Sequence, residues 1–175
     1  MMDLAVIPEC FVDTNLIETL VPPIGKGYNH QKGCGTVTKV MKERFADSFA
    51  LGIIDKDKRQ VDYLNEFTEV IDAGALLLHK HKSKPHYIIQ INPVVETFII
   101  ENATSVGIAI TDYHLPNDMD LFKKESKQEQ SKKDPRFRNL FKAVNKAGAA
   151  DFIKLARWVE YLRDNNYKAD IKEMM

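Results

Sequence analysis

Four short runs of apolar residues predict buried strands. Each run ends at a proline or in polar residues, as expected for strands covered on both faces. The runs occupy residues 4–7, 48–55, 75–81 and 86–91. The clearest of them is "SFALGIID", a nearly continuous apolar stretch that ends abruptly in the charged sequence "DKDKR".

Apolar residues elsewhere recur every three or four positions, which is the spacing of one face of a helix. This spacing predicts helices over residues 14–20, 36–45, 61–71, 92–103, 136–148 and 150–165. Gly74 is expected to close the third of these helices, and Asn92 is expected to cap the fourth, with Pro93 at its first position. The order of the elements predicts an α/β domain with a largely parallel central sheet flanked by helices.

The composition changes after residue 120. Residues 122–138 are polar, which is typical of either a solvated helix or a mobile loop. We therefore interpret 1–120 as the α/β domain, and 121–175 as a basic linker and C-terminal helices packed on the same domain. The stretch from Lys123 to Lys146 contains nine basic residues and three acidic ones. This excess is typical of a nucleic-acid-facing patch or of a soluble helix face.

The overall composition limits the possible partners. The chain has 175 residues, of which 44% are hydrophobic, and 25 basic residues balance 25 acidic ones. Because the net charge is zero, recognition of phosphate has to be local. No apolar stretch approaches the roughly 20 residues of a membrane span, and the first residues do not resemble a signal peptide, so we expect a cytoplasmic protein without a membrane partner. Cys10 and Cys34 lack zinc-ligand spacing and are expected to be reduced thiols.

Acidic residues follow two of the predicted strands. Glu9 comes just after the first run, and Asp55 and Asp57 come just after "LGII". Ligands of open α/β sheets bind at the carboxyl ends of strands, and residues two apart in an extended chain share a face. Carboxylate oxygens suit hard divalent cations. The sequence therefore predicts a Mg²⁺ or Mn²⁺ site at Glu9, Asp55 and Asp57, although each side chain could instead only cap a helix.

"VIPECFVDTNLI" followed by "LGIIDKDK" resembles the Toprim domain, and the likeness covers residues 4–101. That family has a glutamate after its first strand, often within Glu-Gly-x-x-Asp, and an Asp-x-Asp after a later strand. Glu9 matches the glutamate, Asp13 the aspartate four residues on, and Asp55 and Asp57 the Asp-x-Asp. "INPVVETFII" is similar to a segment of small stand-alone Toprim-like bacterial proteins of defence loci. Cys10 departs from the family, which usually has glycine there.

The resemblance implies a helix, a strand and a helix between the two motifs. It also implies a metal-dependent nuclease acting on DNA or RNA, in phage defence or in nucleic-acid processing. Mg²⁺ would be held by Glu9, Asp55 and Asp57, and a second ion would be supported by Asp13. A partner protein or a homodimer is compatible with a stand-alone domain. Five basic residues are expected to contact nucleic acid, namely Lys26, Lys32, Lys56, Lys58 and Arg59.

Two other interpretations remain open. The chain could be a non-catalytic Toprim-like module that binds nucleic acid or a partner. If Asp13 instead of Glu9 is taken as the first acidic site residue, "FVDTNLI" resembles the first strand end of a PIN-type ribonuclease, and that strand would be residues 10–12. Glu43, Asp112 and Asp118 would then supply the further acidic residues of the site. The histidines at 79, 81 and 86 are candidates for zinc ligands, for phosphate contacts or for exposed strand positions.

Overall fold

The computed structural model describes residues 2–57 and 61–175. Its strands are β1 Val6–Pro8, β2 Ala50–Asp55, β3 Phe67–Asp72, β4 Leu76–His81 and β5 His86–Ile91. Its α-helices are α1 Phe11–Leu20, α2 Cys34–Val40, α3 Val95–Ser105, α4 Met119–Ser126, α5 Pro135–Lys146 and α6 Ala150–Asn165. A π-helical turn, Met41–Phe45, extends α2, and the short 3-10 helices are Met2–Ala5, Asp62–Glu66, Ile110–Tyr113, Glu129–Lys132, Asn166–Lys168 and Ile171–Met174.

The strands form one mixed sheet in the order β1-β2-β5-β4-β3. The pairs β1–β2 and β2–β5 are parallel, whereas β4 runs antiparallel to both of its neighbours. The fold is thus α/β as expected, but a largely parallel sheet was the wrong prediction. The reason lies in the connections, because β3 to β4 and β4 to β5 are joined by turns too short for a parallel crossover.

The helix predicted over 61–71 is also wrong. The structure has the 3-10 helix Asp62–Glu66 followed by strand β3. Leu64 and Phe67 are both buried and three residues apart, which suits a 3-10 turn as well as an α-helix. A register shift between Glu69 and Ile71 interrupts the alternation typical of a strand, so the pairing of β3 with β4 is hidden from local spacing.

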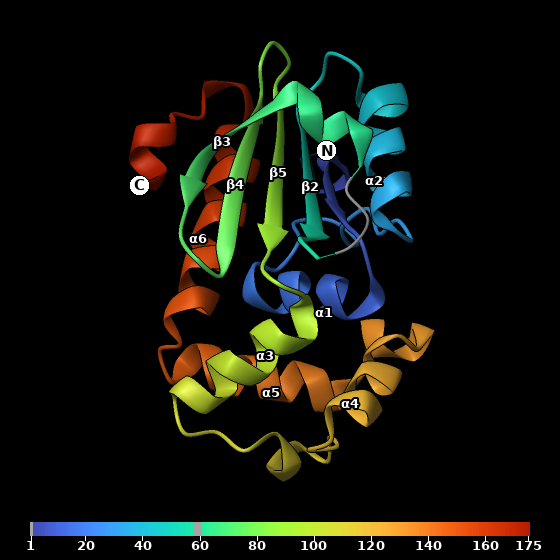
Figure 1. Ribbon diagram of the computed structural model, residues 1–175, viewed down its shortest axis with the longest axis vertical. Coiled ribbons are helices and arrows are strands. Elements are labelled where there is room, and N and C mark those ends of the chain that lie inside the picture. The colour runs from blue at the N-terminus through green and yellow to red at the C-terminus, as the bar shows by residue number, and fades with distance from the viewer. Residues whose placement is uncertain (1, 58–60) are drawn as a thin grey trace.

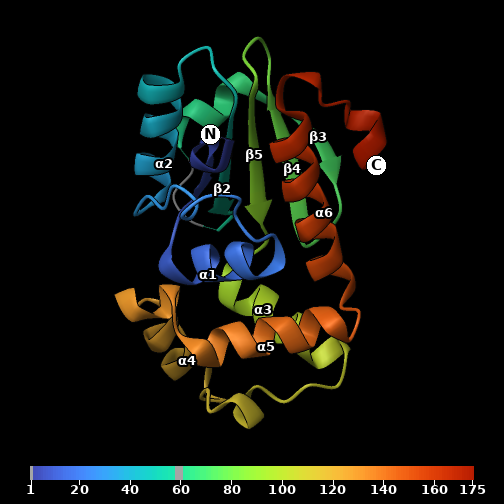
Figure 2. The same cartoon turned by 180° about the vertical axis from the view of Figure 1, so that it is seen from behind.

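Helices cover both faces of the sheet (Figures 1 and 2). On one face, α2 and the 3-10 helix Asp62–Glu66 enclose a small apolar cluster that includes Ile7, Met41 and Ile88. On the other face, α1, α3, α5 and α6 contribute to a larger cluster. In the part of the chain that is described, no helix combines the length and apolar content needed to cross a bilayer.

The polar stretch after residue 120 is ordered by buried hydrogen bonds. Ser126 Oγ donates to Glu96 Oε1 (2.7 Å), and the side-chain amide of Asn15 donates to the carbonyl oxygens of Ser131 (2.8 Å) and Asp134 (3.2 Å). Both serines are at most 1% exposed. The stretch is therefore neither a fully solvated helix nor a mobile loop, because its serines anchor α4 and the turn after it to α1 and α3.

Two local predictions near the sheet edge are corrected. Asn92 does not cap the following helix; its side-chain amide donates to the Gly74 carbonyl (2.9 Å), and α3 begins later, at Val95. Residues 10–12 do not form the strand that the Asp13-anchored alternative needs. Cys10 is the N-cap of α1, and the preceding apolar residues form β1 instead.

Candidate functional site

The fold brings Glu9 and Asp55 together at the carboxyl ends of β1 and β2. The parallel register pairs Pro8 with Ile53, and the Glu9 N–H donates to the Ile53 carbonyl (3.1 Å). Glu9 therefore lies beside the last residues of β2, where its Oε2 accepts a hydrogen bond from the Asp55 N–H (2.9 Å). Glu9 is 0% exposed and Asp55 is 3% exposed. Glu9 and Asp55, 46 residues apart in sequence, are thus buried residues joined by a side-chain to backbone hydrogen bond.

Asp55 also holds the start of a helix. Its Oδ1 accepts a hydrogen bond from the N–H of Val95, the first residue of α3 (3.0 Å). One oxygen of Glu9 and one oxygen of Asp55 therefore bind backbone N–H groups, which is the structural role weighed for such carboxylates from the sequence.

Asp13 and Cys10 lie beside this pair. Asp13 is fully buried in the first turn of α1, and Cys10 Sγ caps that turn by accepting from the Asp13 N–H (3.4 Å). Burial raises the pKa of the Cys10 thiol, and the carboxylates of Asp13 and Asp55 act in the same direction. Cys10 therefore keeps a neutral thiol against the acidic cluster. From the sequence Cys10 was expected only to be a reduced thiol, because the helix was predicted to begin later, at residue 14, and the observed α1 begins at Phe11.

A loop with three glycines, residues 24–33, runs along the outer edge of β1. The N–H groups of Asn29, Gln31 and Gly33 donate to the carbonyls of Val6, Pro8 and Glu9, at 3.0, 3.0 and 3.2 Å. This extended segment lies between α1 and α2, at the point in the chain order where the resemblance implies a strand. It holds the start of α2 directly beside Glu9.

His30 is a site residue that the sequence argument missed. Its Nδ1 lies 3.0 Å from Thr14 Oγ1, and its ring stacks on Phe11 with 4.6 Å between centroids. Burial lowers the pKa of His30, and the charge of Lys132 acts in the same direction. The signal available in the sequence was its place in "IGKGYNHQKGCG", a stretch with four glycines and no helical or strand period, which is typical of a loop that faces a ligand.

Asp57 does not join the buried pair. It is exposed, and its N–H donates to the Pro93 carbonyl (3.0 Å). Within residues 2–57 and 61–175, no three Asp, Glu, His or Cys side chains are grouped so that they could hold a metal ion. The predicted trio of Glu9, Asp55 and Asp57 is thus not a preformed site, because the chain turns to the surface after β2.

The predicted nucleic-acid contacts differ in their placement. Lys26 and Lys32 are exposed in the loop before α2, and Lys56 is exposed directly after Asp55. The charge of Lys56 acts on His79, whose pKa is lowered mainly by burial. The remaining two predicted contacts, Lys58 and Arg59, lie outside the described residues.

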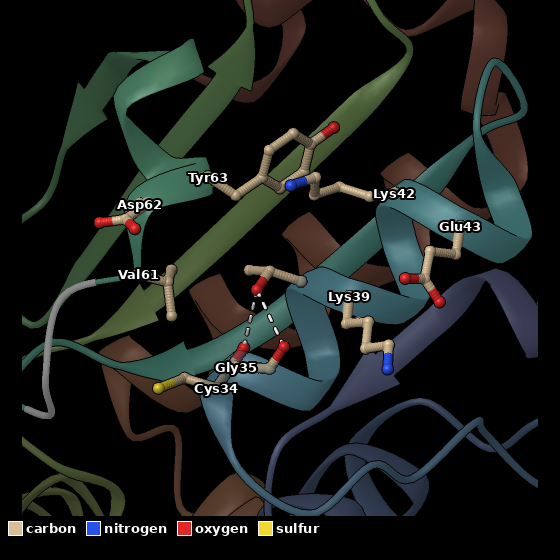
Figure 3. A pocket seen from close by; sticks show the side chains of 9 residues that line it. Cys34, Gly35, Lys39, Lys42, Glu43, Val61, Asp62 and Tyr63 are labelled. Atoms are coloured by element: carbon tan, nitrogen blue, oxygen red, sulfur yellow. Dashed lines mark hydrogen bonds between the residues drawn. The ribbon is translucent and has the colours of Figure 1, made fainter.

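A groove of about 410 Å³ runs along α2 and its π-helical extension (Figure 3). One end is formed by Cys34. The preceding residue, Gly33, donates its backbone N–H to the backbone carbonyl of Glu9. At the other end Lys42 Nζ lies 5.5 Å from the centre of the Tyr63 ring, and Asp62 points away from the helix. The lining residues are Cys34, Gly35, Thr38, Lys39, Lys42, Glu43, Val61, Asp62 and Tyr63.

The three strand histidines are buried, so the expectation of exposed strand positions is wrong. His79 Nε2 lies 2.8 Å from Gln90 Oε1, and His86 Nδ1 lies 2.7 Å from the Tyr63 hydroxyl. His81 Nδ1 accepts two N–H groups of the turn that follows β4. These contacts use the rings within the fold and do not assemble a zinc site among the described residues.

Comparison with protein-family models, curated proteins and solved structures gives no match for this chain. The likeness to the Toprim domain therefore rests on the matching letters at Glu9, Asp13 and the Asp55-x-Asp57 motif. The contact between Glu9 and Asp55 is independent of that likeness.

Proposed function

We propose that this chain is a divalent-metal-dependent phosphoryl-transfer enzyme, a nuclease, with Glu9 and Asp55 as its metal ligands. The observation that carries the proposal is the hydrogen bond from the Asp55 backbone N–H to Glu9 Oε2, which places two buried acidic residues side by side at the carboxyl ends of neighbouring parallel strands. Ligands of α/β sheets bind at this edge, because loops and helix N-termini converge there.

A pair of carboxylates is a sufficient protein contribution for Mg²⁺. This ion usually keeps several waters and binds through one or two carboxylates together with phosphate oxygens of the substrate. Glu9 and Asp55 supply the hard oxygen donors that this mode requires. When bound, the ion would polarise the phosphodiester and lower the pKa of an attacking water. Asp13, buried in the first turn of α1 four residues after Glu9, would add negative charge that favours a second cation.

The groove along α2 supports a substrate with phosphates. Lys39 and Lys42 are exposed along one wall and can offset the charge of phosphates bound in the groove. Gly35 leaves room for close approach, since a Cβ atom there would meet no atom within 4 Å. Lys32 and Lys56, exposed in the segments that flank the cluster, would add to this neutralisation.

A non-catalytic binding module is the second candidate. It is favoured by the bonds of Glu9 to the Asp55 N–H and of Asp55 to the Val95 N–H, since folding alone gives both carboxylates a use. In this case the groove would bind nucleic acid or a protein partner without turnover. Metal binding separates the two candidates.

The test is calorimetric titration of Mg²⁺ and Mn²⁺ into the wild type, Glu9→Gln and Asp55→Asn. Both substitutions remove charge but keep an oxygen that can accept the observed backbone N–H, so the fold should survive. Asp57→Asn is the matched control, because Asp57 is exposed and outside the pair. We expect the first two substitutions to weaken metal binding at least tenfold and the control to leave it unchanged.

A cleavage assay on single- and double-stranded DNA and RNA completes the test. Metal-dependent cleavage that disappears in Glu9→Gln and Asp55→Asn would support the nuclease. If the wild type binds no divalent ion, or if the isosteric variants bind it as well as the wild type, the metal site is wrong. Nucleic-acid binding without metal affinity would point to the non-catalytic module.

A further inference from the structure

Besides the lysines of the groove along α2, a second group of lysines lies at the opposite end of the sheet from Glu9 and Asp55. Lys80 lies near the end of β4, and the turn between β4 and β5 carries Lys82 and Lys84. This turn precedes the first residue of β5, whereas the carboxylate cluster lies beyond the last one. In Figure 1 this turn projects past the end of the sheet. Since β5 has six residues, the two features are separated by about 17 Å of strand.

A pocket of about 410 Å³ lies between this turn and the segment that follows α6. We call it the hairpin pocket; it is lined by Asp47, Lys80, His81, Lys82, Ser83, Lys84, Pro85, Tyr87, Asn166, Tyr167 and Ala169. Its three lysines face a single carboxylate. That carboxylate, Asp47, lies 3.6 Å from Lys84 Nζ, but its side chain is 94% exposed. Exposed ion pairs of this kind are weak, and three lysines against one aspartate leave the pocket lining with a net positive charge.

The other two lysines are held loosely. Lys80 Nζ lies 6.0 Å from the centre of the Tyr87 ring. Lys82 Nζ donates to the Asn65 carbonyl at 3.4 Å, which uses one of the three protons of its ammonium group. Both side chains can therefore turn toward an anion without breaking a strong contact.

Tyr167 presents a fixed aromatic ring in the same pocket. Its hydroxyl accepts a hydrogen bond from the Phe49 N–H (2.9 Å), and its ring meets the Phe49 ring edge-on with 6.3 Å between centroids. The Tyr167 N–H donates to the side-chain oxygen of Asn166 (2.8 Å). Although it is held at both ends, Tyr167 is 57% exposed. A large ring held in place yet exposed is a ready surface for stacking.

We propose that the hairpin pocket binds unpaired nucleotides of a single-stranded nucleic acid. Lysines that neutralise the backbone beside an aromatic ring that stacks on a base are the two parts that such recognition combines. An acidic peptide would use the lysines but would leave the aromatic ring without a flat partner. The inference goes beyond the proposed function, because binding here needs neither a metal ion nor the carboxylate cluster.

The experiment measures fluorescence anisotropy of a labelled single-stranded oligonucleotide of about 12 nucleotides with the full chain in EDTA, so that metal-dependent cleavage cannot interfere. The variants are Tyr167→Leu, which removes the ring, and Lys82→Gln/Lys84→Gln, which removes two charges. Tyr167→Phe keeps the ring and loses only the bond to the Phe49 N–H. Lys142→Gln/Lys146→Gln is the charge-matched control, because both lysines are exposed on α5, far along the chain from the hairpin.

We expect Tyr167→Leu to weaken binding about tenfold, while Tyr167→Phe binds like the wild type. For Lys82→Gln/Lys84→Gln the slope of log affinity against log salt should shrink by about 1.4, since each lost phosphate contact contributes roughly 0.7 for single strands. Thermal unfolding confirms that each variant is folded. Equal loss in the α5 control would assign binding to the basic tail, and tighter binding of a polyglutamate peptide than of the oligonucleotide would assign the pocket to a protein. Either result, or unchanged binding in the pocket variants, overturns the proposal.

Discussion

Asp55 carries both a structural and a proposed chemical role on a single side chain. Asp55→Ala would leave the buried Val95 N–H without its acceptor, which should cost about 1–3 kcal/mol of the free energy of unfolding. Asp55→Asn keeps an acceptor, so we expect it to cost less than about 1 kcal/mol. Urea unfolding measures both. Equal costs for the two variants would show that the bond to Val95 contributes little.

His86 makes the folded state sensitive to acid. It is fully buried, and its Nε2 lies 3.0 Å from the Ser48 carbonyl, so this nitrogen carries the proton and Nδ1 accepts from the Tyr63 hydroxyl. Burial lowers the pKa of His86 from 6.5 to about 4. Between pH 6.5 and 4, His86 is therefore mostly protonated in the unfolded chain and mostly neutral in the folded chain.

The stability contributed by neutral His86 is complete above pH 6.5 and is lost as the pH falls toward 4. We expect the loss to be on the order of 2–3 kcal/mol over this window. Urea unfolding at intervals from pH 7 to 4.5 measures it, and His86→Gln should flatten the dependence. Some slope will remain, since burial also lowers the pKa of His79 and His81. An unchanged slope in His86→Gln would contradict the assignment.

At the scale of elements, α2 packs on β2 through a glycine. A Cβ atom on Gly52 would lie 3.0 Å from Met41 Sδ and 3.1 Å from Val37 Cγ1. Gly52→Ala should therefore push α2 away from the sheet and cost about 1–3 kcal/mol in the free energy of unfolding. In the matched control, Gly35→Ala, the new Cβ meets nothing within 4 Å, and alanine should stabilise the helix by about 0.5–1 kcal/mol. Chemical denaturation of both variants provides the comparison.

The elements themselves show where local pattern suffices. The strands β4 and β5 and the helices α5 and α6 agree with their predictions, because each has a long apolar run or a sustained stripe. Strand β3 was predicted as a helix, since an edge strand half open to solvent and interrupted by a bulge has no clear period of two. Pairing with β4, which is a tertiary contact, decides its conformation.

At the scale of the whole molecule, the C-terminal helices complete the core. Trp158, the only tryptophan of the chain, is 1% exposed on α6 and belongs to the same apolar cluster as β2 and β5. We expect unfolding followed by Trp158 fluorescence to coincide with unfolding followed by far-ultraviolet circular dichroism, as for a single cooperative unit. Separate transitions would mean that the tail unfolds on its own.

Asn15 tests the link between the tail and the sheet layer. Its amide group is buried and donates to the carbonyls of Ser131 and Asp134. Asn15→Ala removes both hydrogen bonds and should cost about 1–3 kcal/mol, although each carbonyl keeps a backbone donor, the Asp134 N–H for Ser131 and the Arg138 N–H for Asp134. If the unit is cooperative, the fluorescence and dichroism midpoints should fall together. A shift in the fluorescence midpoint alone would contradict a shared core.

The sequence by itself determined the apolar runs and helical stripes, and the acidic residues that follow the first two strands. These features are local, since a few consecutive side chains decide whether a segment can bury one face. Only the tertiary structure decided that Glu9 and Asp55 meet while Asp57 turns to the surface, that β4 reverses the sheet, and that Tyr167 lies beside the lysine hairpin. The physical reason is that register, strand direction and burial depend on contacts between residues far apart in the chain, and no local pattern encodes them.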